Sequence, residues 1–333
     1  MRIIAIEEAF AYPPITEATN SGAGFATLKE HYRLFQAIEE RLEDLAETRL
    51  ADMDSGGIDF QVISHTAPGP DSLDAALANR LTREANDALA KAVAAHPDRF
   101  AAFATLPMTD PHAAASELER AVRDLGFRGA LINGTIRGRF LDDSAFAPVL
   151  AKAESLGVPL YLHPSLPPPS VMQAYFSGLS PLQSFTLATG AWGWHCETGL
   201  HTLRLITAGI FDRYPGLQMI IGHMGEMLPF ALGRTDAMLT PFSKHLRQRV
   251  AEYFQTNIWI TTSGVFTHPP LQCALSVIGA DRILFAVDYP YSANVEHPER
   301  VNEEGRRFLD TAPISPADRA KIAHRNAERL LKI

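Results

Sequence analysis

One pattern recurs along the chain and constrains its fold more than any other feature. An Ala- and Leu-rich stretch ends at a glycine, and a short β-branched run follows closely. Glycine suits the left-handed position that ends a helix, and a short apolar run of this kind is typical of a buried parallel strand. The glycines are Gly126, Gly157, Gly216 and Gly279, and the runs are GALIN, VPLYLH, LQMIIGH and DRILFAVD. Each occurrence predicts a helix that leads into a strand.

Four further strands are predicted at 3–7, 59–64, 100–106 and 257–263. Eight strands that alternate with helical patterns favour an α/β fold of the (β/α)8 barrel type over a doubly wound sheet. A doubly wound sheet usually has a glycine-rich phosphate turn after its first strand, whereas this strand ends in EEAF. No change in composition marks a second domain, so we expect residues 1–333 to form a single barrel domain with insertions at its C-terminal face.

The composition excludes several classes of function. The chain of 333 residues has a formal net charge of −8 and no run of Lys and Arg, which argues against nucleic-acid binding. It contains no apolar run long enough for a membrane span, and its N-terminus, MRIIAIEEAF, does not read as a signal peptide. Cys196 and Cys273 provide neither a disulfide framework nor a Cys-x-x-Cys metal pair. We therefore expect a cytoplasmic protein that binds neither nucleic acid nor a membrane.

Polar residues stand at the ends of seven of the eight predicted strands. In a (β/α)8 barrel these ends meet at one face, where the active site is built. A buried charge is costly unless it is paired or bound to a metal; one polar strand end is easily a satisfied core residue, but a whole set indicates a site. The seven residues are Glu7, His65, Asn133, His163, His223, Ser263 and Asp288.

Glu7, His163 and Asp288 offer two carboxylates and one imidazole. Divalent ions such as Zn²⁺, Mn²⁺ and Mg²⁺ accept mixed oxygen and nitrogen ligands of this kind. Three protein ligands leave positions open for water or substrate, as a catalytic site requires. The sequence therefore predicts one catalytic divalent ion held by these three residues.

His223 lies in the segment IIGHMGEMLP, and Glu226 follows three residues later. A carboxylate at this spacing can reach the imidazole across one helical turn and set its tautomer and basicity. A capping role is the alternative for Glu226. Arg234, two turns further on, is either a cation for an anionic substrate or a solvated surface residue.

Two segments are longer than a minimal connection, 11–50 and 164–200. Such insertions usually build or cover the site, although aromatic residues are also enriched at subunit interfaces. Both interpretations stay open for the second segment, which gathers Tyr175, Phe176, Phe185, Trp192, Trp194 and His195.

Five motifs resemble the amidohydrolase-related decarboxylases of aromatic acids, such as γ-resorcylate, 2,3-dihydroxybenzoate, salicylate and 5-carboxyvanillate decarboxylases. They are IEEAFAYP, LYLHP, IFDRYPGLQMIIGHMGEMLP, WITTSG and RILFAVDYPY, in that order over nearly the whole chain. The resemblance implies a distorted barrel, assembled as a homodimer or homotetramer. It implies metal ligation by Glu7, His163 and Asp288, with His223 as the catalytic histidine. Several members carry a histidine where this chain has Ala9, which implies one ligand fewer here.

The resemblance also implies non-oxidative, reversible decarboxylation of a small hydroxylated aromatic acid, such as a 2-hydroxybenzoate, with one divalent ion, Zn or Mn. We predict that Asp288 protonates C1 and that His223 and Glu226 assist. A hydrolase of an ester, lactone or amide on the same barrel is the main alternative, and a non-catalytic binding protein is the second. The predicted substrate contacts are Asn133, Arg234, Tyr291 and Phe25.

Overall fold

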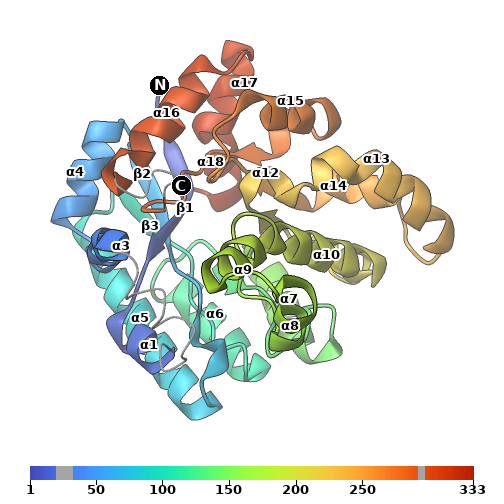
Figure 1. Ribbon diagram of the computed structural model, residues 1–333, viewed down its shortest axis with the longest axis horizontal. Helices are drawn as coiled ribbons and strands as arrows, with labels where there is room; N and C mark the ends of the chain where they lie inside the picture. Colours follow the sequence, from blue (N-terminus) through green and yellow to red (C-terminus); the bar gives the residue numbers. More distant parts are fainter. Residues whose placement is uncertain (20–32, 292–296) are drawn as a thin grey trace.

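The structure is a computed structural model that describes residues 1–19, 33–291 and 297–333. Short parallel strands lie at the centre, and helices lie on the outside of them (Figure 1). The strands are β1 (Ile4–Phe10), β2 (Phe60–His65), β3 (Phe100–Ala102), β4 (Ala130–Asn133), β5 (Leu160–His163), β6 (Met219–Ile221), β7 (Ile258–Thr261) and β8 (Ile283–Leu284). All eight predicted strands are thus present, although β8 is shorter than the run that predicted it.

The order of the strands in space follows their order in the chain, as β1-β2-β3 and β4-β5-β6-β7-β8. Backbone hydrogen bonds also cross both seams between these sheets. The Ala104 N–H donates to the Gly129 carbonyl at 2.8 Å, and the Ile6 N–H donates to the carbonyl of Phe285, just after β8, at 3.1 Å. The predicted (β/α)8 architecture is therefore confirmed.

Side chains along each strand alternate between the inside of the barrel and the surrounding helices. On β1, Ile4 and Ile6 belong to the inner core cluster together with Tyr161 and Ile220. Their neighbours Ile3 and Ala5 pack in the larger cluster between strands and helices. The barrel interior is therefore filled with side chains, and a ligand has to bind at the mouth.

The helices connect and cover the strands. The α-helices are α1 (Pro13–Thr19), α3 (Arg33–Glu43), α4 (Glu47–Gly56), α5 (Ala75–Ala95), α6 (Pro111–Arg123), α7 (Ala147–Leu156), α8 (Pro169–Phe176), α9 (Pro181–Ala188), α10 (Gly193–Thr207), α11 (Ile210–Arg213), α12 (His223–Glu226), α13 (Leu228–Leu239), α14 (Tyr253–Thr256), α15 (His268–Val277), α16 (Val301–Thr311), α17 (Pro316–Ala320) and α18 (Asn326–Leu331). At the start of α6, the Asp110 carboxylate accepts hydrogen bonds from the His112 and Ala113 N–H groups and so caps the helix.

Three of the four glycines in the repeated pattern have positive φ values, 73° at Gly126, 63° at Gly157 and 82° at Gly279. Gly157 is a left-handed cap of α7, whereas Gly279 has a ψ of 166° and lies outside the left-handed helical region. The same prediction for Gly216 is wrong. Its N–H donates instead to Glu154 Oε1 at 2.8 Å, in a turn that follows the short helix α11. Among the described residues, no helix combines the length and the apolar character that crossing a membrane requires.

Candidate metal centre and active site

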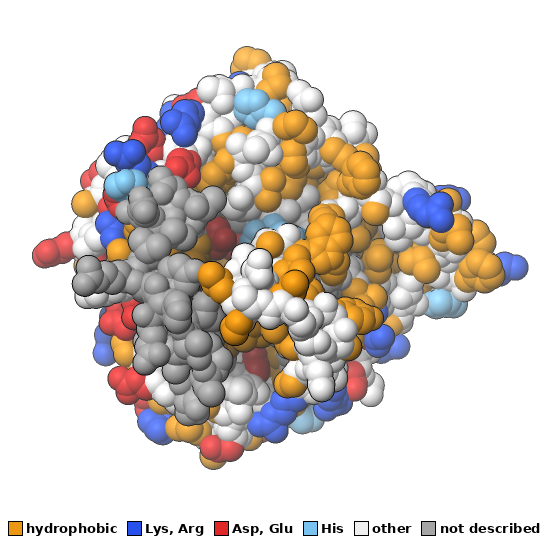
Figure 2. Space-filling model, in the orientation of Figure 1, with side chains coloured by type: hydrophobic (Ala, Val, Ile, Leu, Met, Phe, Trp, Pro, Cys, Tyr) orange, Lys and Arg blue, Asp and Glu red, His pale blue; other side chains and the backbone are white. Residues whose placement is uncertain are grey.

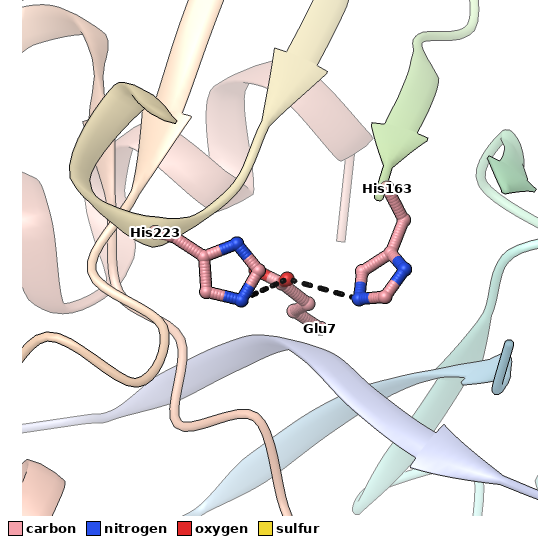
Figure 3. A group of neighbouring side chains, drawn as sticks. All are labelled: Glu7, His163 and His223. Atoms are coloured by element: carbon pink, nitrogen blue, oxygen red, sulfur yellow. Dashed lines mark ion pairs between the residues drawn. The ribbon is translucent and has the colours of Figure 1, made fainter. Parts of the chain in front are cut away.

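Four ionisable side chains meet at the carboxyl ends of β1, β5, β6 and β8. These residues, Glu7, His163, His223 and Asp288, are called the strand-end cluster below. Figure 3 shows both imidazoles pointing toward the Glu7 carboxylate; Glu7 Oε1 lies 3.7 Å from His163 Nε2 and 3.9 Å from His223 Nε2. Asp288 Oδ2 lies 3.7 Å from His223 Nε2. Glu7, His163 and His223 thus place their ligand atoms within 4.8 Å of one another, as a metal site requires. Of the three predicted ligands, Asp288 lies outside this group and is connected to it through His223.

A β-bulge aims Glu7 into the barrel mouth. The register between β1 and β2 shifts between Ile6 and Glu8, and Glu7 has a φ of 142°. A bulge inserts one extra residue and re-aims the side chains next to it. Consecutive glutamates consequently serve different sites, with Glu7 in the strand-end cluster and Glu8 bonded to backbone N–H groups beyond β8.

The two carboxylate oxygens of Glu7 have different environments. Oε2 accepts hydrogen bonds from the hydroxyls of Tyr161 and Thr261. Oε1 is buried and has no hydrogen-bond partner among the described residues. A Cβ on Gly222 would lie 2.8 Å from this oxygen, so only glycine leaves it room. A buried anionic oxygen that faces two imidazoles and lacks a partner fits a divalent cation.

His163 is oriented as a metal-binding histidine. Its Nδ1 lies 2.7 Å from the Pro164 carbonyl and 3.1 Å from Asn133 Oδ1, so Nδ1 carries the hydrogen. The lone pair of Nε2 is then directed toward Glu7. Burial lowers the pKa of His163, which favours the neutral imidazole that metals bind. Asn133, predicted to contact the substrate, orients His163 in this arrangement and is not among the residues that line the cavity.

Glu226 bridges two histidines. Its Oε1 lies 2.8 Å from His223 Nδ1, as predicted, and its Oε2 lies 2.6 Å from Nδ1 of His195 on α10. Burial alone would lower the pKa of His223, but the carboxylates of Glu226 and Glu7 raise it well above its usual value. Burial would raise the pKa of Glu226, and its imidazole partners lower it to about 2.

The segment from His223 to Met227 is a left-handed turn rather than an ordinary helix. All five residues have positive φ values, 48°, 57°, 82°, 52° and 61° in chain order. Non-glycine residues adopt this conformation at an energetic cost of about 1–2 kcal/mol each. Such strain is usually found at functional sites, and here it places His223 and Glu226 in contact while Ser263 Oγ accepts from the His223 N–H at 2.9 Å.

Asp288 is buried beside Glu7 and His223. It also has a left-handed backbone, with a φ of 72°. Burial and the nearby Glu7 carboxylate raise the pKa of Asp288 to about 7, against the opposing effect of His223. Without a cation, these groups favour the protonated form of Asp288.

A cavity of about 590 Å³ opens beside the cluster, between the barrel mouth, α1, α3 and α9. Pockets of this size hold small organic ligands. Figure 2 shows a hollow in this face with hydrophobic side chains around it. Its mostly apolar walls include Ala11, Leu42, Leu166, Phe185, Trp194 and Tyr291, and His163 and Asp288 also line it.

The other predicted contacts have different positions. Tyr291 lines the cavity and its hydroxyl lies 2.6 Å from Thr66 Oγ1. Arg234 is exposed on α13 and is not a lining residue. Phe25 lies outside the described residues. His65 accepts from the Tyr12 N–H at 3.2 Å and bonds the Thr66 carbonyl at 2.7 Å, which gives it a structural role.

Sequence reasoning missed Tyr161, Thr261 and the pairing of His195. Tyr161 precedes His163 by two residues on β5, so strand alternation already predicts that both point toward the same face. Thr261 stands in the same relation to Ser263. The sequence holds no local signal for His195, which lies 31 residues from its partner Glu226.

Comparison with known proteins identifies relatives over the whole chain. The family model described as amidohydrolase matches residues 25–333. The γ-resorcylate decarboxylase of a Polaromonas species is 39% identical, over 99% of this chain and 98% of the relative. Decarboxylase orsB of Emericella nidulans is 40% identical over 89% of this chain and 88% of its own.

One solved structure is informative about the metal. A dihydroxybenzoic acid decarboxylase from the Polaromonas species, with bound manganese and the inhibitor 2-nitroresorcinol, superimposes with a TM-score of 0.86. It is 38% identical and covers 99% of this chain and 97% of its own. This chain therefore belongs to the amidohydrolase family, in the group that includes the γ-resorcylate decarboxylases.

Proposed function

We propose that the protein is a metal-dependent carboxy-lyase that decarboxylates an aromatic acid bearing a hydroxyl next to the carboxyl group. The buried, unpartnered Glu7 Oε1 between two imidazoles carries the proposal, because it calls for a cation beside the protonatable Asp288. The identity of 39% with a γ-resorcylate decarboxylase over 99% of the chain supports the reaction class.

Glu7, His163 and Asp288 are the residues we assign to one divalent ion, manganese or zinc. Bound there, the ion would fix the carboxylate and the adjacent hydroxyl of the substrate and stabilise the phenolate. Tyr161 and Thr261 orient Glu7 through Oε2, and Asn133 orients His163. These hydrogen bonds hold the ligand atoms in place before an ion binds.

Asp288 is the residue we assign as proton donor. In the reaction a C1–H bond forms, the bond from C1 to the carboxylate breaks, its electron pair returns to the ring, and CO₂ leaves. Asp288 lines the cavity and lies beside the His223 imidazole, where a carboxyl group can supply this proton. His223, whose Nε2 lies 3.7 Å from Asp288 Oδ2 and whose Nδ1 is held by Glu226, is the imidazole next to this carboxyl group.

The cavity favours a monocyclic aromatic acid. Its apolar walls suit a ring, and Phe185, Trp194 and Tyr291 provide aromatic surface on which a ring can pack. The carboxylate of the substrate would bind at the end of the cavity that His163 and Asp288 line. A volume of about 590 Å³ also leaves space for ring substituents.

The test is a CO₂-release screen over hydroxylated benzoic acids with the manganese-loaded and the zinc-loaded protein. We expect release from acids with an ortho hydroxyl and none from their para isomers. Nitrophenyl esters and lactones are assayed in parallel. Their hydrolysis without CO₂ release would replace the proposal with the hydrolase alternative, and a protein that binds no metal and turns over neither class would be a binding protein.

We also propose a homodimer or homotetramer in the cytoplasm. Hydrophobic side chains gather over α9 and α10 in Figure 2. The exposed large hydrophobic residues in this part of the sequence include Leu182, Trp192 and Leu200, and Phe230 is exposed on α13. Exposed apolar patches often mark surfaces of association. Both cysteines are free thiols, as in proteins of reducing compartments. Light scattering of the purified protein measures the mass of the assembly, and the mass of a monomer would contradict the proposed homodimer or homotetramer.

A further inference from the structure

One stretch of the chain differs from the rest in its charge. Residues 164–203 contain a single Asp, Glu, Lys or Arg, which is Glu197, whereas these residues make up 20% of the whole chain. One oxygen of Glu197 is itself buried. The stretch includes α8, α9 and most of α10, on the outside of the barrel (Figure 1). Solvated surfaces hold most of the charged residues of a protein, so surface helices without them indicate a different environment.

The same stretch exposes large hydrophobic side chains. Among the described residues, thirteen large hydrophobic side chains are exposed, and seven of them lie in this stretch. Trp192, Cys196 and Leu200 are all exposed and recur every four residues, so they form one stripe along α10. On the neighbouring α9, Leu182 and Leu187 are 42% and 38% exposed. These five residues are called the α9–α10 face below.

The charge of the molecule favours a second copy of this chain as the partner of the α9–α10 face. The interfaces of permanent homodimers are more apolar than those of transient complexes, and charged residues are depleted at their centre. The chain has a net charge of −8, so two copies repel each other unless they meet through an uncharged surface. An uncharged face is compatible with its own copy, as a two-fold contact requires.

The helices that present this face also form part of the cavity wall. Phe185 of α9 and Trp194 of α10 both line the cavity, and α9 packs on α8 and α10. The two helices therefore lie between the α9–α10 face and the site where the proposed substrate binds. A second copy packed on the face would restrain the helices and, with them, both aromatic walls.

We propose that the α9–α10 face is the surface through which two copies of this chain associate, and that this contact holds Phe185 and Trp194 in place as walls of the cavity. The second half of the inference rests on the proposed function, because it concerns the binding of the aromatic acid. The first half depends only on the charge and exposure of residues 164–203.

Leu200→Glu tests the face, and Val277→Glu is its matched control. Leu200 is 51% exposed on α10, and Val277 is 40% exposed on α15, outside the stretch. The introduced carboxylate would place a charge from each copy in an apolar contact. By light scattering we expect half the wild-type mass or less for Leu200→Glu, and the wild-type mass for the control. A monomeric wild type overturns the inference, as does an equal loss in the control. An unchanged mass in Leu200→Glu overturns the face and leaves the homo-oligomer itself standing.

The reactivity of Cys196 measures the same contact without any substrate. Cys196 is an exposed free thiol, and Cys273→Ser removes the other thiol. In that background the assembled protein should react slowly with a thiol reagent at Cys196, and added Leu200→Glu should make the reaction severalfold faster. A new carboxylate one helical turn away would by itself disfavour the thiolate and slow the reaction, so faster labelling reports exposure. Equal rates in the two proteins overturn the face.

CO₂ release tests the connection to the cavity. We expect kcat/KM for a hydroxybenzoate to fall about tenfold in Leu200→Glu, since displaced walls misplace the ring, and to stay at the wild-type value in Val277→Glu. Full activity in a dissociated Leu200→Glu protein overturns the role of the contact at the cavity. If the wild type releases no CO₂ from any hydroxybenzoate, the proposed function fails, whereas the mass and the thiol labelling still decide whether the α9–α10 face is the contact.

Discussion

Two buried polar clusters border β1 and differ in how their hydrogen bonds are satisfied. The strand-end cluster begins at Glu7, and its central oxygen has no partner among the described residues. The second cluster begins at the next residue and is called the Arg49 cluster. Its members are Glu8, Arg49, Asp52, Gln61 and Tyr289, all of them buried.

In the Arg49 cluster the donors and acceptors match. Arg49, which is 0% exposed, donates to the Ala9 carbonyl at 2.6 Å and to Gln61 Oε1 at 3.2 Å, and its guanidinium lies 4.8 Å from the ring centroid of Tyr289. The Glu8 oxygens accept from the N–H groups of Val287 at 3.0 Å and Tyr289 at 3.1 Å. This network joins β1, β2, α4 and the segment after β8.

The difference between the clusters shows how a buried carboxylate can be assigned a role. Burial is common to Glu7 and Glu8, so burial alone does not identify a site. A network that satisfies its own members stabilises the fold. A network that leaves an anionic oxygen facing two imidazoles is complete only with an added cation. Substitutions in the two clusters should therefore affect different properties.

The largest effect is expected for Glu7→Gln, which removes the charge of the unpartnered oxygen. We expect metal content to fall below about a tenth of an equivalent and CO₂ release to fall roughly 10³-fold or more, since a metal contributes several kcal/mol to catalysis. The metal-free variant should unfold at no lower denaturant concentration than the metal-free wild type, because an unpaired buried charge is lost. Elemental analysis and denaturant titration measure both, and a normal metal content would refute the assignment.

The next effect is expected in the other cluster, for Arg49→Met. Removing one member of a buried charged network costs about 3–5 kcal/mol of stability, here because Gln61 Oε1 and the Ala9 carbonyl lose their donor. Urea denaturation measures the loss. The fraction that remains folded should bind metal with wild-type affinity, and a metal defect larger than the folding defect would show that the clusters are not independent.

Tyr161→Phe tests the orientation of Glu7. The tyrosine hydroxyl donates to Oε2, and the conservative change removes that bond while keeping the ring inside the barrel. Loss of a group that orients a metal ligand typically weakens metal binding about 10–100-fold. Competition with a chelator measures the affinity. Unchanged affinity would mean that Thr261, which donates to the same oxygen at 2.8 Å, is sufficient by itself.

The contrast between the clusters was only partly predictable from the sequence. The rule that parallel strands place their carboxyl ends together predicted the position of Glu7, His163, His223 and Asp288. The opposite environments of Glu7 and Glu8 follow from the bulge in β1, which depends on pairing with β2 and has no local sequence signal.

Two further features of the site also depend on long-range packing. Only one of the five residues in the left-handed turn from His223 to Met227 is a glycine, Gly225. The conformational preference of the other four residues opposes the turn. The contact of Glu226 with His195 joins residues far apart in the chain through α10, whose position the sequence pattern leaves open. Tertiary contacts override local preference at both places.

The smallest effect is expected for Tyr289→Phe, the counterpart of the Tyr161 substitution. The Tyr289 hydroxyl also donates to a buried carboxylate, Asp52 Oδ2, at 2.8 Å, but Asp52 keeps the Arg41 guanidinium at 2.8 Å. We expect a loss of about 1–2 kcal/mol in stability and no change in metal affinity. Tyrosine-to-phenylalanine changes of equal size, each beside a carboxylate, would then have separate consequences, one for metal binding and one for folding. Chelator competition and urea denaturation on both variants decide the matter. Equal metal affinities would mean that Thr261 orients Glu7 without the Tyr161 hydroxyl, and that the two tyrosine hydroxyls do not separate metal binding from folding.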